Sequence, residues 1–185
     1  MKILVGYASK HGATKGIAEH ISQTLETAGL EVTLKPVEDA GRVTEYDAFV
    51  IGSAAYMGGW MGEATTFVRR HRDVLARHPV WLFSSGPIGN EPLDSKGRDQ
   101  LVASRPKEFE EFARSVQPRD EHVFFGAYDP DAKAVGMAEG LMARFMRVMP
   151  AVRNAIPAGD YRDWPAIEAW AQGIAHDLQP VGAKS

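Results

Sequence analysis

The residues best suited to chemistry come early in the chain, directly after its first apolar run. They are small, basic or hydroxyl-bearing: Ser9, Lys10, His11, Gly12, Ala13 and Thr14. The backbone N–H groups of this stretch and the hydroxyls of Ser9 and Thr14 can converge on an anion, and the positive end of a following helix favours that charge. We therefore expect a phosphate-binding loop. The alternative is a helix start capped by Ser9 or Thr14 without any ligand.

The glycine pattern indicates which kind of phosphate this loop would bind. The loop has a single glycine, Gly12, and matches neither G-x-x-x-x-G-K-[ST] nor G-x-G-x-x-G. Those two motifs hold nucleoside triphosphates and the pyrophosphate of dinucleotides. The loop therefore predicts a ligand with one terminal phosphate, a monoester.

Two later stretches, GSAAYMGGW at 52–60 and SSGPIGN at 84–90, are also rich in small residues. Small side chains let the backbone approach a planar ligand, and Tyr56 or Trp60 can stack on or cover one of its faces. The two stretches therefore predict a flat ring held between them. The residues that we expect to bind the cofactor here are Ala54, Ala55, Tyr56, Met57, Gly58, Ser84, Ser85, Gly86, Pro87 and Gly89.

Alternating strands and helices must position these three stretches. Short apolar runs predict strands at residues 3–8, 32–37, 48–52, 80–85 and 123–128. Helical spacing of apolar residues predicts helices at 12–28, 62–78, 106–116 and 164–178. This order implies a doubly wound, mainly parallel α/β sheet with helices on both faces, and Pro36 places the second strand at an edge. Ligands of such sheets bind at the carboxyl ends of the strands, where all three stretches fall.

Composition narrows the function further. The 185 residues, 44% of them hydrophobic and 24% charged, suit one domain over 1–185, and a net charge of −3 gives no bulk attraction to nucleic acid. The absence of cysteine excludes disulfides, iron–sulfur clusters and thiol nucleophiles, so redox chemistry would need a bound cofactor. The first apolar run is too short for a signal peptide or a membrane span, so we expect a cytoplasmic protein.

An extra segment at about 129–160 is longer than a compact α/β unit needs. Its Met-rich, basic stretch at 135–156 has amphipathic helical spacing. Three interpretations stay open: a channel wall for a large apolar substrate, a peripheral contact with the inner face of a membrane, or a core helix covering the sheet edge.

Other candidate residues favour ordinary surface roles. His71 and His78 share a helical face, but no carboxylate completes a metal-binding set with them, so we expect no metal. The arginine-rich run at 67–78 has no interleaved stacking aromatics, which favours a solvated helix face over a nucleic-acid site. No side chain stands out as a general acid or base, so catalytic residues stay unassigned.

The sequence resembles the flavodoxin family over nearly its whole length. The phosphate loop of that family reads T/S-x-T-G-x-T, and SKHGAT keeps Ser9, Gly12 and Thr14 with His11 in place of a hydroxyl. The resemblance implies a flavodoxin-like, three-layer α/β/α fold whose five strands run in the order 2-1-3-4-5. It also implies FMN as the cofactor, with its ring between the two later stretches.

Within that family, four stretches resemble the menaquinone-dependent, oxygen-independent protoporphyrinogen oxidases: ILVGYASKHGATKGIAEHI, YDAFVIGSA, FVRRHRDVL and YRDWPAIEAWAQGIAHDL. This resemblance implies a quinone-linked, FMN-dependent oxidoreductase that acts on an organic substrate. The chain departs from those oxidases at Tyr56 and Met57, where they carry a basic and an aromatic residue, and at Gly59, where they carry histidine.

Two alternatives belong to other classes of protein. One is a non-enzymatic electron-transfer protein that serves a reductase, and the other is a regulatory or binding domain that has lost its flavin. The stretch at 84–90 contains no aromatic residue, and the predicted helix at 62–78 contains several arginines. Both features make a simple electron carrier the less favoured interpretation of the sequence.

Overall fold

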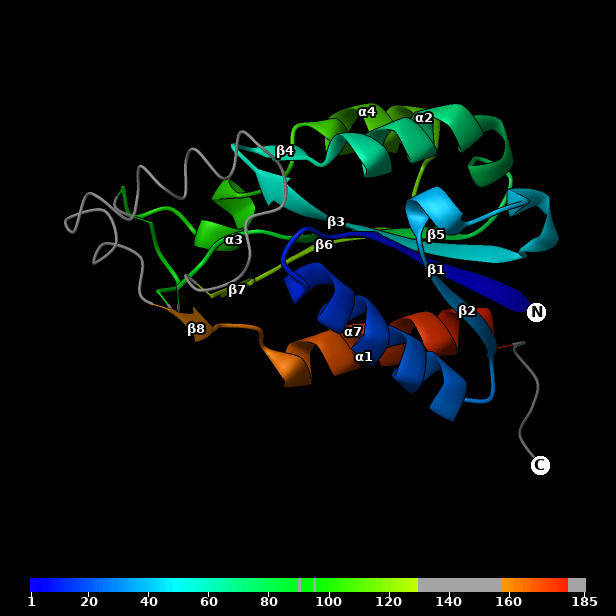
Figure 1. The fold of residues 1–185 in the computed structure, drawn as a ribbon, viewed down its shortest axis with the longest axis horizontal. Helices are drawn as coiled ribbons and strands as arrows, with labels where there is room; N and C mark the ends of the chain where they lie inside the picture. The colour runs from blue at the N-terminus through cyan, green and yellow to red at the C-terminus, as the bar shows by residue number, and fades with distance from the viewer. Residues whose placement is uncertain (90, 95, 130–157, 180–185) are drawn as a thin grey trace.

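Five parallel strands form the centre of the computed structural model, which describes residues 1–89, 91–94, 96–129 and 158–179 (Figure 1). Their order in the sheet is β2-β1-β3-β5-β6, which confirms the predicted order 2-1-3-4-5. A short sixth strand, β4, pairs antiparallel with the end of β3. The bounds are β1 (Lys2–Ala8), β2 (Glu31–Pro36), β3 (Ala48–Tyr56), β4 (Gly59–Trp60), β5 (Val80–Ser85) and β6 (Asp120–Phe124).

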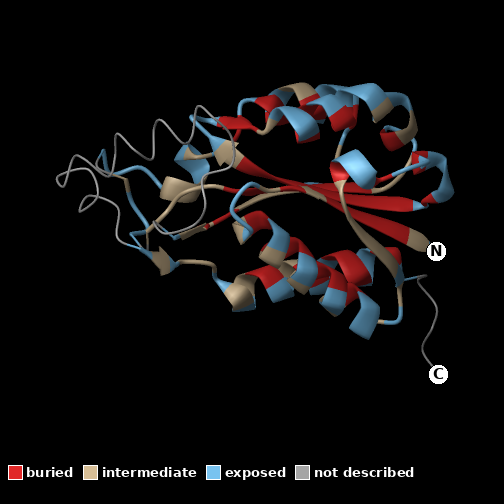
Figure 2. Cartoon of the chain, viewed as in Figure 1, coloured by how far each residue is buried: buried red, intermediate tan, exposed pale blue. Residues whose placement is uncertain are grey.

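Helices cover both faces of the sheet. On one face lie α1 (Ala13–Thr27) and α7 (Trp164–Leu178), and on the other lie α2 (Gly62–Leu75) and α4 (Glu108–Ser115) (Figure 1). Each helix turns its buried side toward the sheet and its exposed side toward solvent (Figure 2). Shorter helical elements are η1 (Val37–Asp39), η2 (Val43–Glu45) and α3 (Gln100–Ala103).

Alternating residues of the same strands build two separate cores. Leu4, Phe49 and Ile51 pack with the helices α2 and α4, whereas Ile3 and Val50 pack with α1 and α7. Because β1, β3 and β5 are buried on both faces, almost every position in them can be apolar. Pro36 ends β2, which lies at the edge of the sheet as predicted, since an edge strand tolerates a missing N–H.

Two strand predictions were wrong in their bounds. The third strand continues through Tyr56 instead of ending at Gly52, because Ala54 still pairs with β5 and because Ala55 and Tyr56 pair with β4 in a hairpin. The fifth strand spans 120–124 instead of 123–128, because an edge strand can carry charged residues on its solvent side. Residues 127–128 form the separate strand β7 (Ala127–Tyr128), which pairs antiparallel with β8 (Gly159–Asp160).

The extra segment is described only at residues 129 and 158–160. The strand β7, which directly precedes the segment, lies beside β8 at its end. The predicted amphipathic stretch at 135–156 lies outside the described residues, so its three interpretations stay predictions. Among the helices of the described residues, none is long and apolar enough to cross a membrane.

Close packing between β3 and β5 depends on Gly52. Gly52 and Phe83 are register partners in the two strands, and a Cβ built on Gly52 would overlap the Phe83 ring. Phe83 is fully buried and its ring also lies 6.3 Å from that of Phe124. Phe83 directly precedes Ser84 and Ser85, so this packing lies next to the third predicted stretch.

We expect Gly52→Ala to destabilise the protein by about 1–3 kcal/mol, because the added methyl overpacks the core against an aromatic ring. Gly62→Ala at the start of α2 is the matched control, since nothing lies within 4 Å of a Cβ there. The control should change stability by no more than about 0.5 kcal/mol. Urea unfolding of both variants checks this, and equal midpoints would contradict the packing argument.

Candidate functional site

The first loop connects β1 to α1 at the carboxyl edge of the sheet. Gly12 is the N-cap of α1 with φ of 85°, a left-handed conformation that glycine adopts without strain. The alternative in which Ser9 or Thr14 caps the helix is wrong, because α1 has no side-chain cap. Ser9 instead stabilises the loop, since its Oγ accepts the Gly12 N–H at 3.1 Å.

The start of α1 is suited to an anion. The first N–H groups of a helix have no acceptor within the helix, and the macrodipole makes that end positive. The described first turn of α1 carries no acidic side chain that would compete with an anion, and it contains Lys15. The local backbone therefore agrees with the phosphate-binding loop that the sequence predicts.

A hydrogen bond joins the first loop to the third stretch. Thr14 is 1% exposed, and its Oγ1 lies 2.6 Å from the Oγ of Ser85 at the end of β5. These residues are 71 positions apart in the chain, so the contact exists only because β1 and β5 end at the same edge. The neighbouring Ser84 is fully buried and its hydroxyl faces the carbonyl of Ser53, so it supports the sheet from within.

The second stretch is a tight β-hairpin. Met57 and Gly58 form its turn with φ of 51° and 76°, and Met57 is completely exposed. Two left-handed residues in succession match the right-handed twist of a two-residue hairpin. The hairpin thus points its tip into solvent beside the first loop.

Helix α4 holds the base of this hairpin. The buried Glu108 accepts the N–H of Trp60 at 3.0 Å, and the carbonyl of Gly58 accepts the N–H of Lys107 at 3.1 Å. The Trp60 ring is 6% exposed and packs at 5.3 Å from the ring of Phe109. Of the two aromatics proposed as a ring cover, Trp60 therefore belongs to the core, whereas Tyr56 is 44% exposed.

The third stretch is tied to the chain that follows β6. Gly86 donates its N–H to the carbonyl of Phe124 at 3.0 Å, and the carbonyl of Pro87 accepts the N–H of Gly126 at 2.9 Å. Gly89 has φ of 128°. These backbone bonds fix the path of the stretch as it leaves the sheet.

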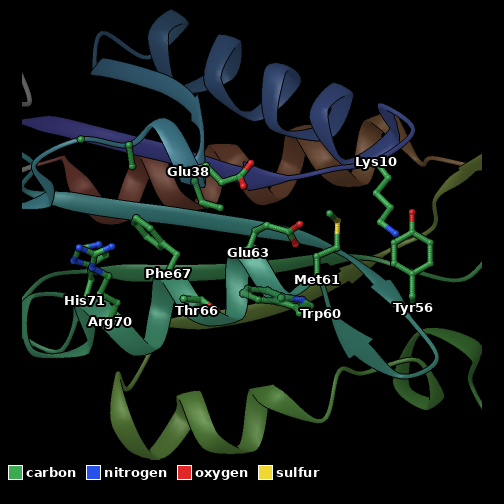
Figure 3. A pocket seen from close by; sticks show the side chains of 14 residues that line it. Lys10, Glu38, Tyr56, Trp60, Met61, Glu63, Thr66, Phe67, Arg70 and His71 are labelled. Atoms are coloured by element: carbon green, nitrogen blue, oxygen red, sulfur yellow. The ribbon is translucent and has the colours of Figure 1, made fainter. Parts of the chain in front are cut away.

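Lys10 and Tyr56 bring the first two stretches together at the surface. The Lys10 ammonium lies 5.4 Å from the centre of the Tyr56 ring, and Figure 3 shows the lysine side chain reaching toward that ring. This distance is within the range of a cation–π contact. Lys10 to Tyr56 and Thr14 to Ser85 therefore connect all three predicted stretches at one edge of the sheet.

A groove of about 900 Å³ begins at Lys10 and Tyr56 and follows α2. Apolar side chains such as Phe67 and Met61 line part of it, and Glu38 and Glu63 project into its middle (Figure 3). At its far end, partial burial and, to a lesser degree, the neighbouring Arg70 lower the pKa of His71, so its imidazole is neutral at pH 7. The groove thus offers apolar and charged contacts beside the candidate site.

Most of the predicted residues lie on or beside this edge. His11 and Met57 are exposed, Ala13 and Ala55 are half-buried, and Ala54 is buried in β3. No cluster of three or more metal-ligating side chains occurs in the described ranges.

The sequence missed Arg162, which reaches the same edge from the segment before α7. Its Nη1 donates to the carbonyl of Ala13 at 3.2 Å. The two residues are 149 positions apart, so no local pattern points to this contact. One sequence feature relates to this contact: Gly16 lies inside the helix predicted at 12–28, where a glycine is unfavourable, and Arg162 occupies the space beside it.

A family comparison agrees with this fold. A sequence model described as the flavodoxin domain matches residues 4–149. That match spans more than half of the 185 residues, and the chain belongs to the flavodoxin-domain family. A search of curated proteins finds no significant match.

Solved structures similar to this chain share its fold at low sequence identity. A cysteine-to-serine mutant of flavodoxin from Pseudomonas aeruginosa has a TM-score of 0.56 at 18% identity, over 96% of this chain and 99% of its own. Rubredoxin oxygen:oxidoreductase from Desulfovibrio gigas has a TM-score of 0.56 at 14% identity, over 96% of this chain and 36% of its own. Two-electron reduced Megasphaera elsdenii flavodoxin has a TM-score of 0.51 at 17% identity, over 66% of this chain and 85% of its own.

These comparisons confirm the flavodoxin resemblance at the level of family and fold. They do not support the narrower resemblance to the protoporphyrinogen oxidases, which stays a prediction.

We expect Thr14→Val and Ser85→Ala each to destabilise the apoprotein by about 1–3 kcal/mol, because each leaves the other hydroxyl buried without its partner. The double variant should lose less than the sum, since removing both hydroxyls relieves that penalty. A double-mutant cycle from urea unfolding measures the coupling. Strict additivity would show that the two hydroxyls do not interact.

Proposed function

We propose that this protein binds FMN and transfers electrons through it. The observation that carries the proposal is the convergence of the three stretches through Thr14 with Ser85 and Lys10 with Tyr56. The convergence brings the start of α1, a helix end that favours an anion, beside two stretches of small residues, and this arrangement supports a ligand with a phosphate and a flat ring. Membership in the flavodoxin-domain family supports the same cofactor.

The residues present fit this cofactor. The backbone of residues 9–14, with Ser9 and Thr14, would hold the phosphate. The hairpin at 54–58 and the stretch from Ser84 to Gly89 would flank the ring, with Tyr56 against one side. FMN supplies the redox chemistry when bound. The chain would orient the ring, and the exposed hairpin tip would leave room beside it for a redox partner.

An electron-transfer role has better support than the enzymatic role implied by the oxidase resemblance. The matched family and the flavodoxin structures support it, one of which is a flavodoxin in its two-electron reduced state. We propose a cytoplasmic location and no nucleic-acid partner.

A second candidate function is a quinone-linked, protoporphyrinogen-oxidase-like oxidoreductase. The groove of about 900 Å³ favours it, because the groove starts at Tyr56 and could bring an organic substrate or a quinone to the ring. In this case the residues of the groove, rather than a partner surface, select the molecule that exchanges electrons.

We expect the purified protein to release FMN on heating, because the first loop suits one terminal phosphate and has no pyrophosphate motif. Mass spectrometry of the released ligand identifies the flavin. Recovery of FAD, or no binding after reconstitution with FMN, would contradict the proposal.

Ser9→Ala tests whether the phosphate of FMN binds at the first loop. It removes a hydroxyl and the acceptor of the Gly12 N–H, and it should weaken FMN by about 1–3 kcal/mol. Riboflavin, which lacks the phosphate, should change far less. Equal losses for both flavins in a fluorescence titration would place the phosphate elsewhere.

The two candidate functions differ in their response to Thr66→Trp, which fills the groove at an exposed position on α2. For an electron carrier, reduced protein should deliver electrons to ferricyanide and to a lipophilic quinone as fast as wild type does. For the oxidoreductase, the quinone rate should fall by about tenfold while the ferricyanide rate persists. Asp73→Trp, on the same helix outside the groove, is the matched control, and stopped-flow absorbance measures both rates.

A further inference from the structure

Arg162 joins the segment before α7 to the first turn of α1. Its Nε and Nη2 donate to the two carboxylate oxygens of Asp160 at 2.7 and 2.6 Å. Its Nη1 donates to the carbonyl of Ala13, the first residue of α1, at 3.2 Å. The side chain is 16% exposed, so this guanidinium is held in a largely buried position.

One aromatic contact restricts the guanidinium further, and a second holds the ring that it contacts. Its central carbon lies 4.4 Å from the centre of the Trp164 ring, and that ring lies 5.2 Å from the ring of His20 on α1. Arg162 is therefore held by a carboxylate, a carbonyl and an aromatic face at once. A planar fork with five donors can satisfy all three contacts, whereas an ammonium cannot.

Gly16 provides the space that Arg162 occupies. A Cβ built on Gly16 would overlap the Arg162 Nη1 and would lie 3.8 Å from the Trp164 ring. A glycine inside a helix costs up to about 1 kcal/mol relative to alanine, so its presence in α1 calls for a compensating contact. The close approach of Arg162 is that contact.

We propose that Arg162 is a positioning residue for the phosphate end of the cofactor, acting through the first turn of α1. This inference rests on the proposed FMN binding. The N–H groups that would bind the phosphate belong to the turn whose carbonyl Arg162 holds. A small displacement of such groups weakens binding, because their bonds to a charged ligand depend on distance and direction.

In this proposal Arg162 affects phosphate binding through the position of the first turn of α1, and the net charge of its side chain contributes little. Hydrogen bonds from Arg162 hold the pKa of the Asp160 carboxyl below its usual range, so the carboxylate is ionised at neutral pH. The ion pair is therefore close to neutral as a whole. A variant that keeps the positive charge but loses the planar guanidinium should therefore weaken FMN as much as a variant that loses both the charge and the guanidinium.

The experiment compares Arg162→Lys and Gly16→Ala with wild type, and Gly173→Ala is the matched control. Gly173 also lies inside a helix, and nothing lies within 4 Å of a Cβ there. We expect both test variants to weaken FMN by about tenfold, because a charged hydrogen bond is worth that much, and to change riboflavin affinity by less than about twofold. The control should leave both affinities unchanged.

Hydrogen exchange of the flavin-free protein supplies a second readout. Amides at 13–17 should exchange faster in Arg162→Lys than in wild type or Gly173→Ala, while urea unfolding shows that each variant is folded. If wild type binds FMN but the ratio of FMN to riboflavin affinity is unchanged in both test variants, the inference is overturned and the proposed function stands. If wild type binds no flavin, the proposed function fails and the inference with it.

Discussion

Burial of β1, β3 and β5 on both faces is the constraint on which the rest of the structure depends. A strand without a solvent face must be covered by helices on two sides, and each helix must cross over to reach the next parallel strand. All carboxyl ends then meet at one edge, and polar residues gather there because the strand interiors exclude them. Thr14 and Ser85 lie at that boundary and form a buried hydrogen bond where the apolar core ends.

The hairpin shows how one wall of the site is both rigid and exposed. Its base is fixed by Glu108 and Lys107 of the α4 region, while Tyr56 and Met57 extend into solvent. A wall anchored in this way can hold a flat ring without itself being covered. Under the proposed function, the same arrangement would leave an edge of the bound ring accessible at the surface.

Features fixed by local pattern were predictable from the sequence. Helix α7 was predicted at its observed bounds, since apolar spacing coincides with an Asp163 N-cap that accepts the Ala166 N–H. The hairpin was not predicted, because small residues such as Ala54 look like a loop and because Met57 adopts a conformation that methionine rarely takes. The sequence also could not distinguish Trp60 in a core from Trp60 over a ligand.

The two faces of the sheet have separate roles in this arrangement. Arg162 and Trp164 lie against the first turn of α1 on the α1 and α7 face, whereas the hairpin base and the groove belong to the α2 and α4 face. The two cores share no residue in the described chain, since they take alternate side chains of the same strands. The groove residues make none of the contacts of Arg162. Under the proposed function, their substitution would therefore alter the groove without loosening the turn that would retain the cofactor.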